Sequence, residues 1–351
     1  MLTGIYTALI TPMTADGQID EPGLERLIEF QLTSSIAGLV PAGTTGESPT
    51  LSDEERQRGI ECSCRLAGSQ VSVIAGAGSN STSHTLAACA GAARAGARGV
   101  LLVDPYYNGP SSLEIRCEYI APVARRFPDL EIIPYVVPAR TGTQLDPVDL
   151  ALLATQFANV RTVKEASPNS LENAAVTRRL CGDDFAILSG DDAANLPLMR
   201  DPEIAASGAI SVVANIAPGA VSSMAEAALS GNWSEADRLH RALEPLARIV
   251  HVETIEQTPL GTVPCRARSP LPIKTLMQFL GMPAGPCRPP LGRMTRSGVE
   301  VLRVAARGIL RDDPFILDPI AAHFGVDLAA RLDDDELAAS LSYTGYGEAV
   351  S

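Results

Sequence analysis

The sequence predicts an α/β protein, a (β/α)8 TIM barrel followed by a C-terminal helical subdomain. Apolar runs alternate with amphipathic stretches eight times before Gly231, and only helical patterns follow that residue. The apolar runs are continuous, as expected of parallel strands buried on both faces. Eight such units in about 230 residues favour a closed barrel over a doubly wound sheet.

The eight expected strands are the short apolar runs that end in turn-forming or polar residues. In chain order they cover residues 5–10, 38–41, 71–75, 99–103, 131–136, 160–165, 186–189 and 209–213.

An amphipathic stretch follows each of these strands and predicts a helix. Ser52 and Glu55 form a capping-box pattern that starts the second helix. The eight expected helices cover residues 21–33, 52–67, 82–95, 113–126, 147–157, 171–181, 193–200 and 218–229.

Beyond the barrel, three further helices are expected at residues 233–254, 271–280 and 297–310. The stretch 256–270 is rich in Pro, Thr and Gly and is interpreted as a loop. The acidic segment 311–351 is interpreted as a solvated appendage. The expected organisation is therefore a barrel with the active site at 1–230, a helical subdomain at 231–310 and an acidic tail at 311–351.

Composition excludes several classes of function. A formal charge of −13 argues against nucleic-acid binding and against residence on anionic lipid. No apolar run reaches the length of a membrane span, and no signal peptide is evident. The seven cysteines are scattered and the four histidines dispersed. We therefore expect a cytoplasmic protein with neither a metal nor a cofactor.

Lysine is almost absent from the chain. Lys164 and Lys274 are the two lysines among 28 basic residues. Unlike arginine, a buried lysine can lose its proton and attack a carbonyl. Lys164 lies at the end of the sixth expected strand, which makes it a candidate Schiff-base nucleophile, although a genome biased toward arginine would leave the same pattern. No chemistry is assigned to Lys274.

Catalytic groups of a barrel lie at the carboxyl ends of its strands. The second expected strand ends in Gly43-Thr44-Thr45-Gly46, which could present amides and hydroxyls to a carboxylate or could simply be a turn. On the fifth expected strand, Tyr135 can share a site with Lys164 of the neighbouring strand and relay protons, or it can be a core residue. Arg140 follows in the next loop and could bind a carboxylate or lie free at the surface.

Three more strand ends carry candidate residues. After the fourth strand, Tyr106 and Tyr107 suggest an interface or the wall of a site. Gly190 permits close approach of a ligand, and the acidic pair that follows it is interpreted as a helix cap rather than a metal site. Ile210 lies in the eighth strand.

Together these motifs resemble the dihydrodipicolinate synthase and N-acetylneuraminate lyase family of Schiff-base aldolases. The resemblance runs from Gly4 to about residue 310 and rests on Gly-Thr-Thr-Gly-Glu, Tyr-Tyr-Asn, Tyr-x-x-Pro-x-Arg-Thr-Gly and Val-Lys-Glu-Ala, in the family's order. It implies a barrel with C-terminal helices, assembled as a homodimer or homotetramer.

The resemblance also implies roles for individual residues. Lys164 matches the lysine that forms an imine with pyruvate, and Tyr135 matches the central proton relay. Thr44 and Thr45 match the pair that holds the pyruvate carboxylate, with Thr44 also passing protons. Tyr107 matches the tyrosine that crosses into the neighbouring subunit's site.

Three further matches concern substrate binding. Arg140 matches the arginine that binds the carboxylate of the second substrate, and Gly190 and Ile210 match residues that line the pyruvate pocket.

Within the family, Thr44-Thr45 together with Arg140 is typical of the synthase. The implied reaction is condensation of pyruvate with L-aspartate-4-semialdehyde to give 4-hydroxy-tetrahydrodipicolinate. Pro134 and Val136 depart from the family pattern around the tyrosine, so two alternatives stay open. One is a pyruvate-dependent aldolase or dehydratase acting on a 2-keto-3-deoxy sugar acid, and the other is a catalytically silent barrel used for binding or regulation.

The resemblance implies a possible allosteric lysine site as well. Ser48, Asn80 and Tyr106 match it, whereas His84 stands where an acidic residue is usual. We therefore expect weak or absent inhibition by L-lysine.

Overall fold

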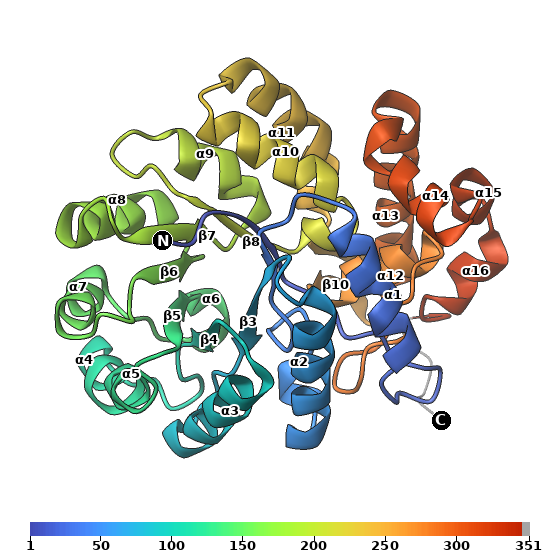
Figure 1. Ribbon diagram of the computed structural model, residues 1–351. Helices are drawn as coiled ribbons and strands as arrows, with labels where there is room; N and C mark the ends of the chain where they lie inside the picture. Colours follow the sequence, from blue (N-terminus) through green and yellow to red (C-terminus); the bar gives the residue numbers. More distant parts are fainter. Residues whose placement is uncertain (346–351) are drawn as a thin grey trace.

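The computed structural model describes residues 1–345, and its centre is a closed barrel of eight parallel strands (Figure 1). The strands follow one another in chain order, and Gly4 paired with Gly208 closes the barrel between the first and the eighth. The strands are β1 (Gly4–Thr7), β2 (Gly38–Leu39), β3 (Ser72–Gly76), β4 (Gly99–Val103), β5 (Glu131–Val136), β6 (Thr162–Glu165), β7 (Ala186–Ser189) and β8 (Gly208–Ser211). The predicted barrel is confirmed.

Helices surround the barrel between successive strands (Figure 1). The capping box of Ser52 and Glu55 is present at the start of α2. In the fourth unit, a π-helical turn at Ile115–Ile120 interrupts the expected single helix. The outer helices are α1 (Glu21–Leu32), α2 (Asp53–Ala67), α3 (Thr82–Ala95), α4 (Ser112–Glu114), α5 (Ala121–Arg126), α7 (Pro147–Gln156), α8 (Ser170–Cys181), α9 (Asn195–Arg200) and α10 (Pro218–Leu229), and the short α6 (Pro138–Thr141) follows β5.

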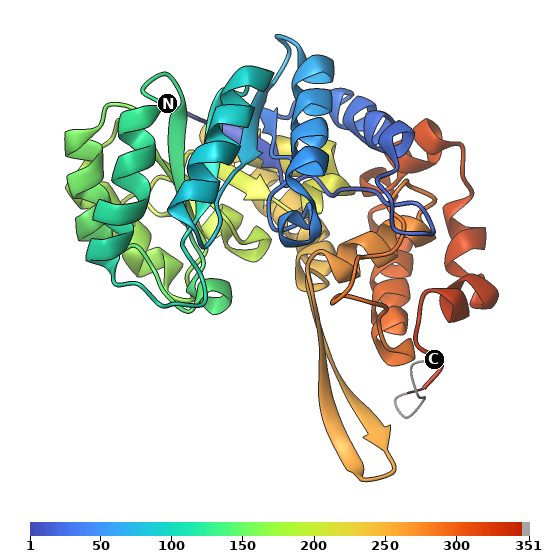
Figure 2. The ribbon, with the colours of Figure 1, turned by 90° about the horizontal axis from the view of Figure 1, so that it is seen from below.

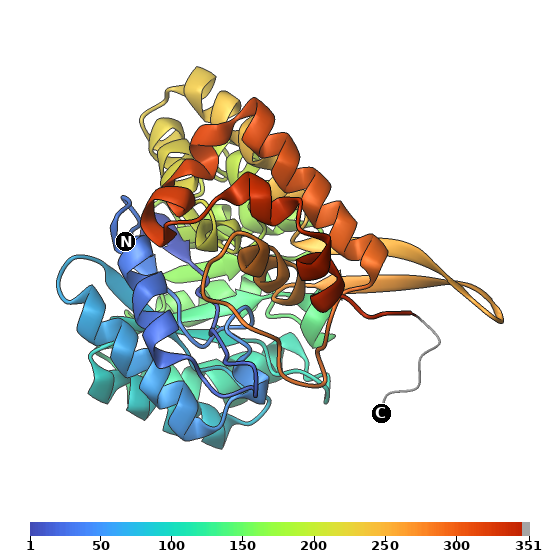
Figure 3. The same ribbon diagram turned by 90° about the vertical axis from the view of Figure 1, so that its right-hand side faces the viewer.

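The C-terminal helices pack on one side of the barrel (Figure 3). They begin with α11 (Trp233–Arg248), α12 (Leu271–Phe279) and α13 (Arg296–Asp312). Buried apolar side chains of all three helices belong to the same hydrophobic core as the barrel. This packing places α12 where it can reach the loops at the mouth of the barrel.

The segment between α11 and α12 is a β-hairpin, so the predicted loop at 256–270 is wrong. Strands β9 (His251–Thr258) and β10 (Gly261–Arg268) pair antiparallel and project from the body as an arm (Figure 2). The expected helix at 233–254 accordingly ends at Arg248. Only the base of the arm is anchored in the core, since Val252 and Ala267 are buried whereas Leu260 at the tip is fully exposed.

The acidic C-terminal segment is not a solvated appendage over the residues that the structure describes. Three helices, α14 (Asp318–Phe324), α15 (Leu328–Leu332) and α16 (Asp335–Ser340), follow α13. Ile320 and Leu332 are completely buried. The acidic run forms ion pairs with α13, where Arg303 meets Asp335 at 2.9 Å and Arg307 meets Asp333 at 2.8 Å. The expected tail therefore folds onto the subdomain, and its last residues, 346–351, lie outside the described part.

No helix within residues 1–345 combines the length and the apolar character that crossing a membrane requires.

Candidate active site at the barrel mouth

Lys164 and Tyr135 occupy facing positions on neighbouring strands of the barrel. Their Cα atoms are register partners between β5 and β6, and both residues are almost fully buried. The Lys164 Nζ lies 4.1 Å from the centroid of the Tyr135 ring. The structure thus brings together the two residues that strand adjacency predicted to share a site.

Burial changes the protonation of both groups. Desolvation lowers the pKa of Lys164 to about 7, while the Asp192 carboxylate raises it and the Arg140 guanidinium lowers it. A substantial fraction of the amine is therefore neutral near neutral pH, the form that attacks a carbonyl. Burial also raises the pKa of Tyr135, against the lowering effect of Arg140, so the phenol keeps a proton that it can donate.

Gly190 packs directly against the stem of Lys164. A Cβ at this position would lie 2.9 Å from the Lys164 Cε and 2.8 Å from the Ala166 Cβ. A side chain here would force the Lys164 stem or Ala166 to shift, so the packing favours glycine. Ile210 is buried on β8.

The two acidic residues after Gly190, Asp191 and Asp192, make different hydrogen bonds. Asp191 accepts a hydrogen bond from the Ala193 amide, as the predicted helix cap would. Asp192 instead accepts hydrogen bonds from the Ser211 hydroxyl and from the amides of Val212 and Val213, at 2.9 and 3.1 Å. Asp192 thereby links the end of β7 to the end of β8 beside Lys164. Sequence reasoning did not distinguish it from Asp191.

The loop after β2 carries Thr44 and Thr45 at the same end of the barrel. The Ser48 amide donates to the Gly43 carbonyl and the Glu47 amide to the Thr44 carbonyl, which closes the loop into a tight turn. Thr45 is buried and Thr44 partly exposed. Among the described residues no hydrogen bond joins either threonine to Lys164. The two threonines and Lys164 lie at the same end of the barrel without direct contact through a hydrogen bond.

Glu47 anchors this loop to the C-terminal helices through Lys274, a contact that sequence reasoning missed. The Lys274 Nζ lies 2.6 Å from the Glu47 Oε1, and it also donates to the carbonyls of Thr11 and Pro286 at 3.0 and 2.8 Å. The second carboxylate oxygen of Glu47 accepts from the Arg288 amide at 2.9 Å. The one available signal was that Lys274 is the other lysine of the chain.

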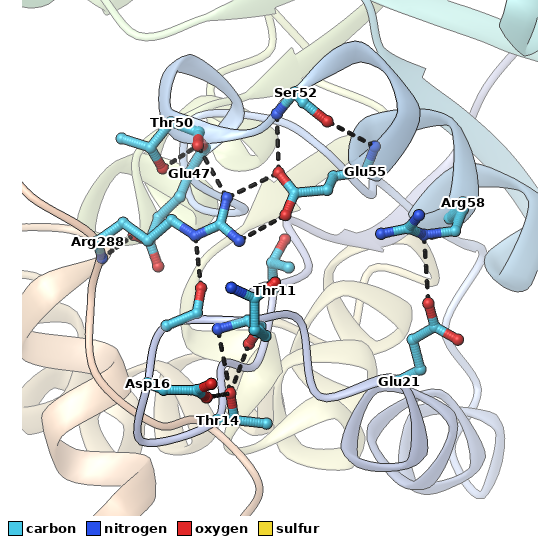
Figure 4. Close-up of polar contacts among 12 residues, drawn as sticks. Thr11, Thr14, Asp16, Glu21, Glu47, Thr50, Ser52, Glu55, Arg58 and Arg288 are labelled. Carbon is cyan, nitrogen blue, oxygen red and sulfur yellow. Dashed lines mark hydrogen bonds and ion pairs between the residues drawn. The ribbon is translucent and has the colours of Figure 1, made fainter.

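A second ion pair reinforces the same connection (Figure 4). The Arg288 guanidinium binds both carboxylate oxygens of Glu55, at 2.6 and 2.7 Å, and donates to the carbonyls of Thr50 and Gly17. Because Glu55 also caps α2, one arginine joins the start of that helix to the segment after α12.

Arg140 extends from α6 at the rim of the barrel. The residue as a whole is exposed, but burial of its guanidinium lowers the pKa of Arg140. The guanidinium donates to the Ser269 carbonyl at 3.0 Å, next to the hairpin. Its charge acts on both Tyr135 and Lys164. Arg140 is therefore part of the electrostatic environment of the site.

Tyr107, in the loop after β4, is unusual in its exposure and its backbone conformation. Its side chain is 92 % exposed and its φ of 81° lies in the left-handed region, which is uncommon for a residue with a side chain. The four residues matched to a lysine site lie on different elements. Ser48 begins the 3-10 turn Ser48–Thr50, Asn80 is exposed before α3, His84 is exposed in its first turn, and Tyr106 is partly buried.

Comparison with known proteins supplies the family. The model of the dihydrodipicolinate synthetase family matches residues 1–307. The chain belongs to this family.

Similar proteins carry a consistent name. The chain is 40 % identical over 303 residues to the 4-hydroxy-tetrahydrodipicolinate synthase of Methanothrix thermoacetophila, covering 86 % of this chain and 95 % of that one. It is 36 % identical over 308 residues to the protein of the same name from Methanococcus maripaludis, covering 88 % and 99 %. The predicted enzyme class, a lyase, and the predicted synthase function are confirmed by these relatives, and neither alternative function is.

Solved structures agree with the sequence relatives. The 4-hydroxy-tetrahydrodipicolinate synthase of Methylacidiphilum fumariolicum SolV superposes with a TM-score of 0.81 at 32 % identity, covering 90 % of this chain and 100 % of that one. Dihydrodipicolinate synthase from Aquifex aeolicus gives a TM-score of 0.78 at 34 % identity, covering 90 % and 99 %.

Proposed function

We propose that Lys164 forms a Schiff base with pyruvate, and that the resulting enamine condenses with L-aspartate-4-semialdehyde. The observation that carries this proposal is the buried Lys164 amine, which lies over the Tyr135 ring with a pKa lowered to about 7. A neutral amine at the mouth of a barrel has the nucleophilicity that imine formation requires.

The bonds form and break in the following order. The amine adds to the keto carbon of pyruvate, and loss of water gives the imine. Loss of a methyl proton gives the enamine, whose carbon attacks the aldehyde of the second substrate. The amino group of that substrate then attacks the imine carbon, which closes the ring and releases Lys164. Each step moves a proton, and Tyr135 is the buried acid placed to move it.

The other residues of the site bind pyruvate and transfer protons. Thr44 and Thr45 hold the carboxylate of pyruvate, and Thr44 passes protons between Tyr135 and Tyr107. Gly190 and Ile210 line the pyruvate pocket. The close packing of Gly190 against the Lys164 stem supports its assignment to this pocket.

Arg140 binds the carboxylate of the aldehyde. Its position at the rim, where its charge acts on both Tyr135 and Lys164, supports this role. A second substrate with a carboxylate remote from its aldehyde would therefore reach both Arg140 and the enamine.

We also propose that the enzyme works as a homodimer or homotetramer. An exposed tyrosine held in a left-handed backbone conformation costs free energy that a partner subunit would offset, and Tyr107 is such a residue. One similar solved structure is described as a monomeric variant of dihydrodipicolinate synthase. Sedimentation of the purified chain would distinguish a monomer from a homodimer or homotetramer.

The cysteines support a reducing compartment, and we place the enzyme in the cytoplasm. All seven are free thiols. Burial raises the pKa of Cys89 and of Cys287 to about 12, which keeps both unreactive.

Turnover tests the proposed reaction directly. The purified protein with pyruvate and L-aspartate-4-semialdehyde should form product, whereas a Lys164→Arg variant should form none. Cleavage of 2-keto-3-deoxy sugar acids without this condensation would favour the alternative aldolase.

A further inference from the structure

The base of the β9–β10 hairpin is joined to the rim of the barrel by two reciprocal hydrogen bonds. Arg140 of α6 donates to the carbonyl of Ser269 at 3.0 Å, and Arg268 donates to the carbonyl of Ala139 at 3.3 Å. His251 is the register partner of Arg268 across the hairpin. The hairpin therefore places one arginine and one histidine beside the turn that carries Arg140.

The two arginines have no acidic partner within residues 1–345. Their hydrogen bonds go to backbone carbonyls, and neither takes part in an ion pair among the described residues. Arg266, two residues earlier on the same strand, differs because it pairs with Glu253 at 3.0 Å. Each guanidinium has five donors, so most of those on Arg140 and Arg268 stay free for a ligand.

The charges are close enough to act on one another. Partial desolvation lowers the pKa of His251, and the charges of Arg140 and Arg268 lower it further, while the Asp191 and Glu253 carboxylates raise it. The two guanidinium groups repel one another, and an anion bound between them would offset this repulsion. The placement is typical of a carboxylate site.

From these contacts we infer that Arg268 is a specificity-determining residue, a second guanidinium that binds the carboxylate of the aldehyde substrate together with Arg140. The inference rests on the proposed function, since it concerns the second substrate of that reaction. Arg268 also holds the Ala139 carbonyl, so the hairpin fixes the turn from which Arg140 extends. In this arrangement the hairpin is an addition to the barrel that selects carboxylate-bearing aldehydes.

Steady-state kinetics of an Arg268→Gln variant test this inference. Glutamine removes the charge but retains a side-chain amide that can donate to Ala139. The KM for L-aspartate-4-semialdehyde should rise by about tenfold or more, as expected for loss of a charge-assisted hydrogen bond. The KM for pyruvate and the borohydride-trapped pyruvate adduct should stay unchanged, because neither step involves the second substrate.

Two further variants keep the test specific. Arg268→Lys retains the charge without the planar fork and should give an intermediate KM for the aldehyde. Arg266→Gln is the matched control on the same strand and should leave both KM values unchanged.

The possible outcomes separate this inference from the proposed function. An unchanged aldehyde KM in Arg268→Gln, with an active wild type, would overturn the role of Arg268 and leave the synthase reaction intact. Equal losses of pyruvate trapping and aldehyde binding would also overturn it, because they would indicate a general structural role. A wild type that traps no pyruvate would instead reject the proposed function.

Discussion

Lys274 and Glu47 form a buried ion pair between two parts of the chain that are 227 residues apart. Their side chains are 1 % and 0 % exposed, and the Nζ to Oε1 distance is 2.6 Å. Glu47 ends the turn that carries Thr44 and Thr45, and Lys274 lies on α12 of the C-terminal subdomain. The subdomain therefore holds a loop of the candidate active site in place.

Removing one partner of this pair should be strongly destabilising. In Lys274→Met, the Glu47 carboxylate is left buried without a counter-charge, at a cost of about 3–5 kcal/mol. The double variant Lys274→Met with Glu47→Gln should recover much of this loss. Urea unfolding of the three proteins measures it, and a double variant no more stable than the single one would contradict the explanation.

Asp104 should make the protein less stable as the pH rises. Its side chain is completely buried, its Oδ2 accepts from the Leu145 amide at 3.0 Å, and its Oδ1 has no partner among the described residues. Burial raises its pKa from 3.8 to about 8. The pKa of Asp104 is higher in the folded state than in the unfolded state. Below about pH 4 the carboxyl is protonated in both states and does not destabilise the protein. As the pH rises toward 8, the unfolded state loses this proton first, so the free energy of unfolding falls.

The isosteric variant Asp104→Asn separates this contribution from other titrations. Between pH 5 and pH 7 the free energy of unfolding of the wild type, relative to that of the variant, should fall by up to about 1.4 kcal/mol per pH unit. A difference that does not change with pH would show that Asp104 titrates normally.

Replacing Gly190 should impair imine formation more than folding. The Cβ of Gly190→Ala would meet the Lys164 Cε at 2.9 Å and push the amine from its place. We expect a loss of about 100-fold in the rate of pyruvate trapping, as displacements of about 1 Å produce in active sites. Gly59→Ala is the matched control, because a Cβ at Gly59 in α2 meets no atom within 4 Å. Equal rates in the two variants would refute the packing argument.

Inhibition by L-lysine should be weak. His84 is exposed at the start of α3, where it offers no carboxylate to a lysine ammonium. Activity measured against increasing L-lysine should change little, and His84→Glu should increase the sensitivity. An inhibition constant for the wild type in the micromolar range would contradict this expectation.

Much of the barrel could be predicted from the sequence because each buried strand is a continuous apolar run. The pairing of Tyr135 with Lys164 followed from the adjacency of successive strands. The hairpin was missed because its Pro, Thr and Gly residues resemble a loop, although Val252, Thr254 and Ile255 supply the β-branched residues of a strand.

The folding of the acidic segment and the ion pair of Lys274 depend on contacts between residues far apart in the sequence, which local sequence patterns do not reveal. The acidic run near Asp333 is typical of a solvated face until the arginines of α13 are known to lie opposite. The partner of Lys274 is equally remote in sequence. Sequence reasoning thus located the residues of the candidate site but not the groups that hold them.

Imine formation should follow the titration of Lys164. Desolvation lowers the pKa of this amine to about 7, so its neutral fraction rises through that pH. The rate of pyruvate trapping should increase from pH 5 to pH 8 and then level off. A rate that still increases tenfold per pH unit above pH 8 would indicate an unshifted lysine.

The most direct test of the account is to locate the adduct that borohydride traps with pyruvate. The chain has two lysines, so peptide mass spectrometry gives a choice between Lys164 and Lys274. We predict a single reduced adduct on Lys164, none on the ion-paired Lys274, and none in Lys164→Arg. An adduct on Lys274, or no adduct at all, would contradict the assignment of Lys164 as the nucleophile.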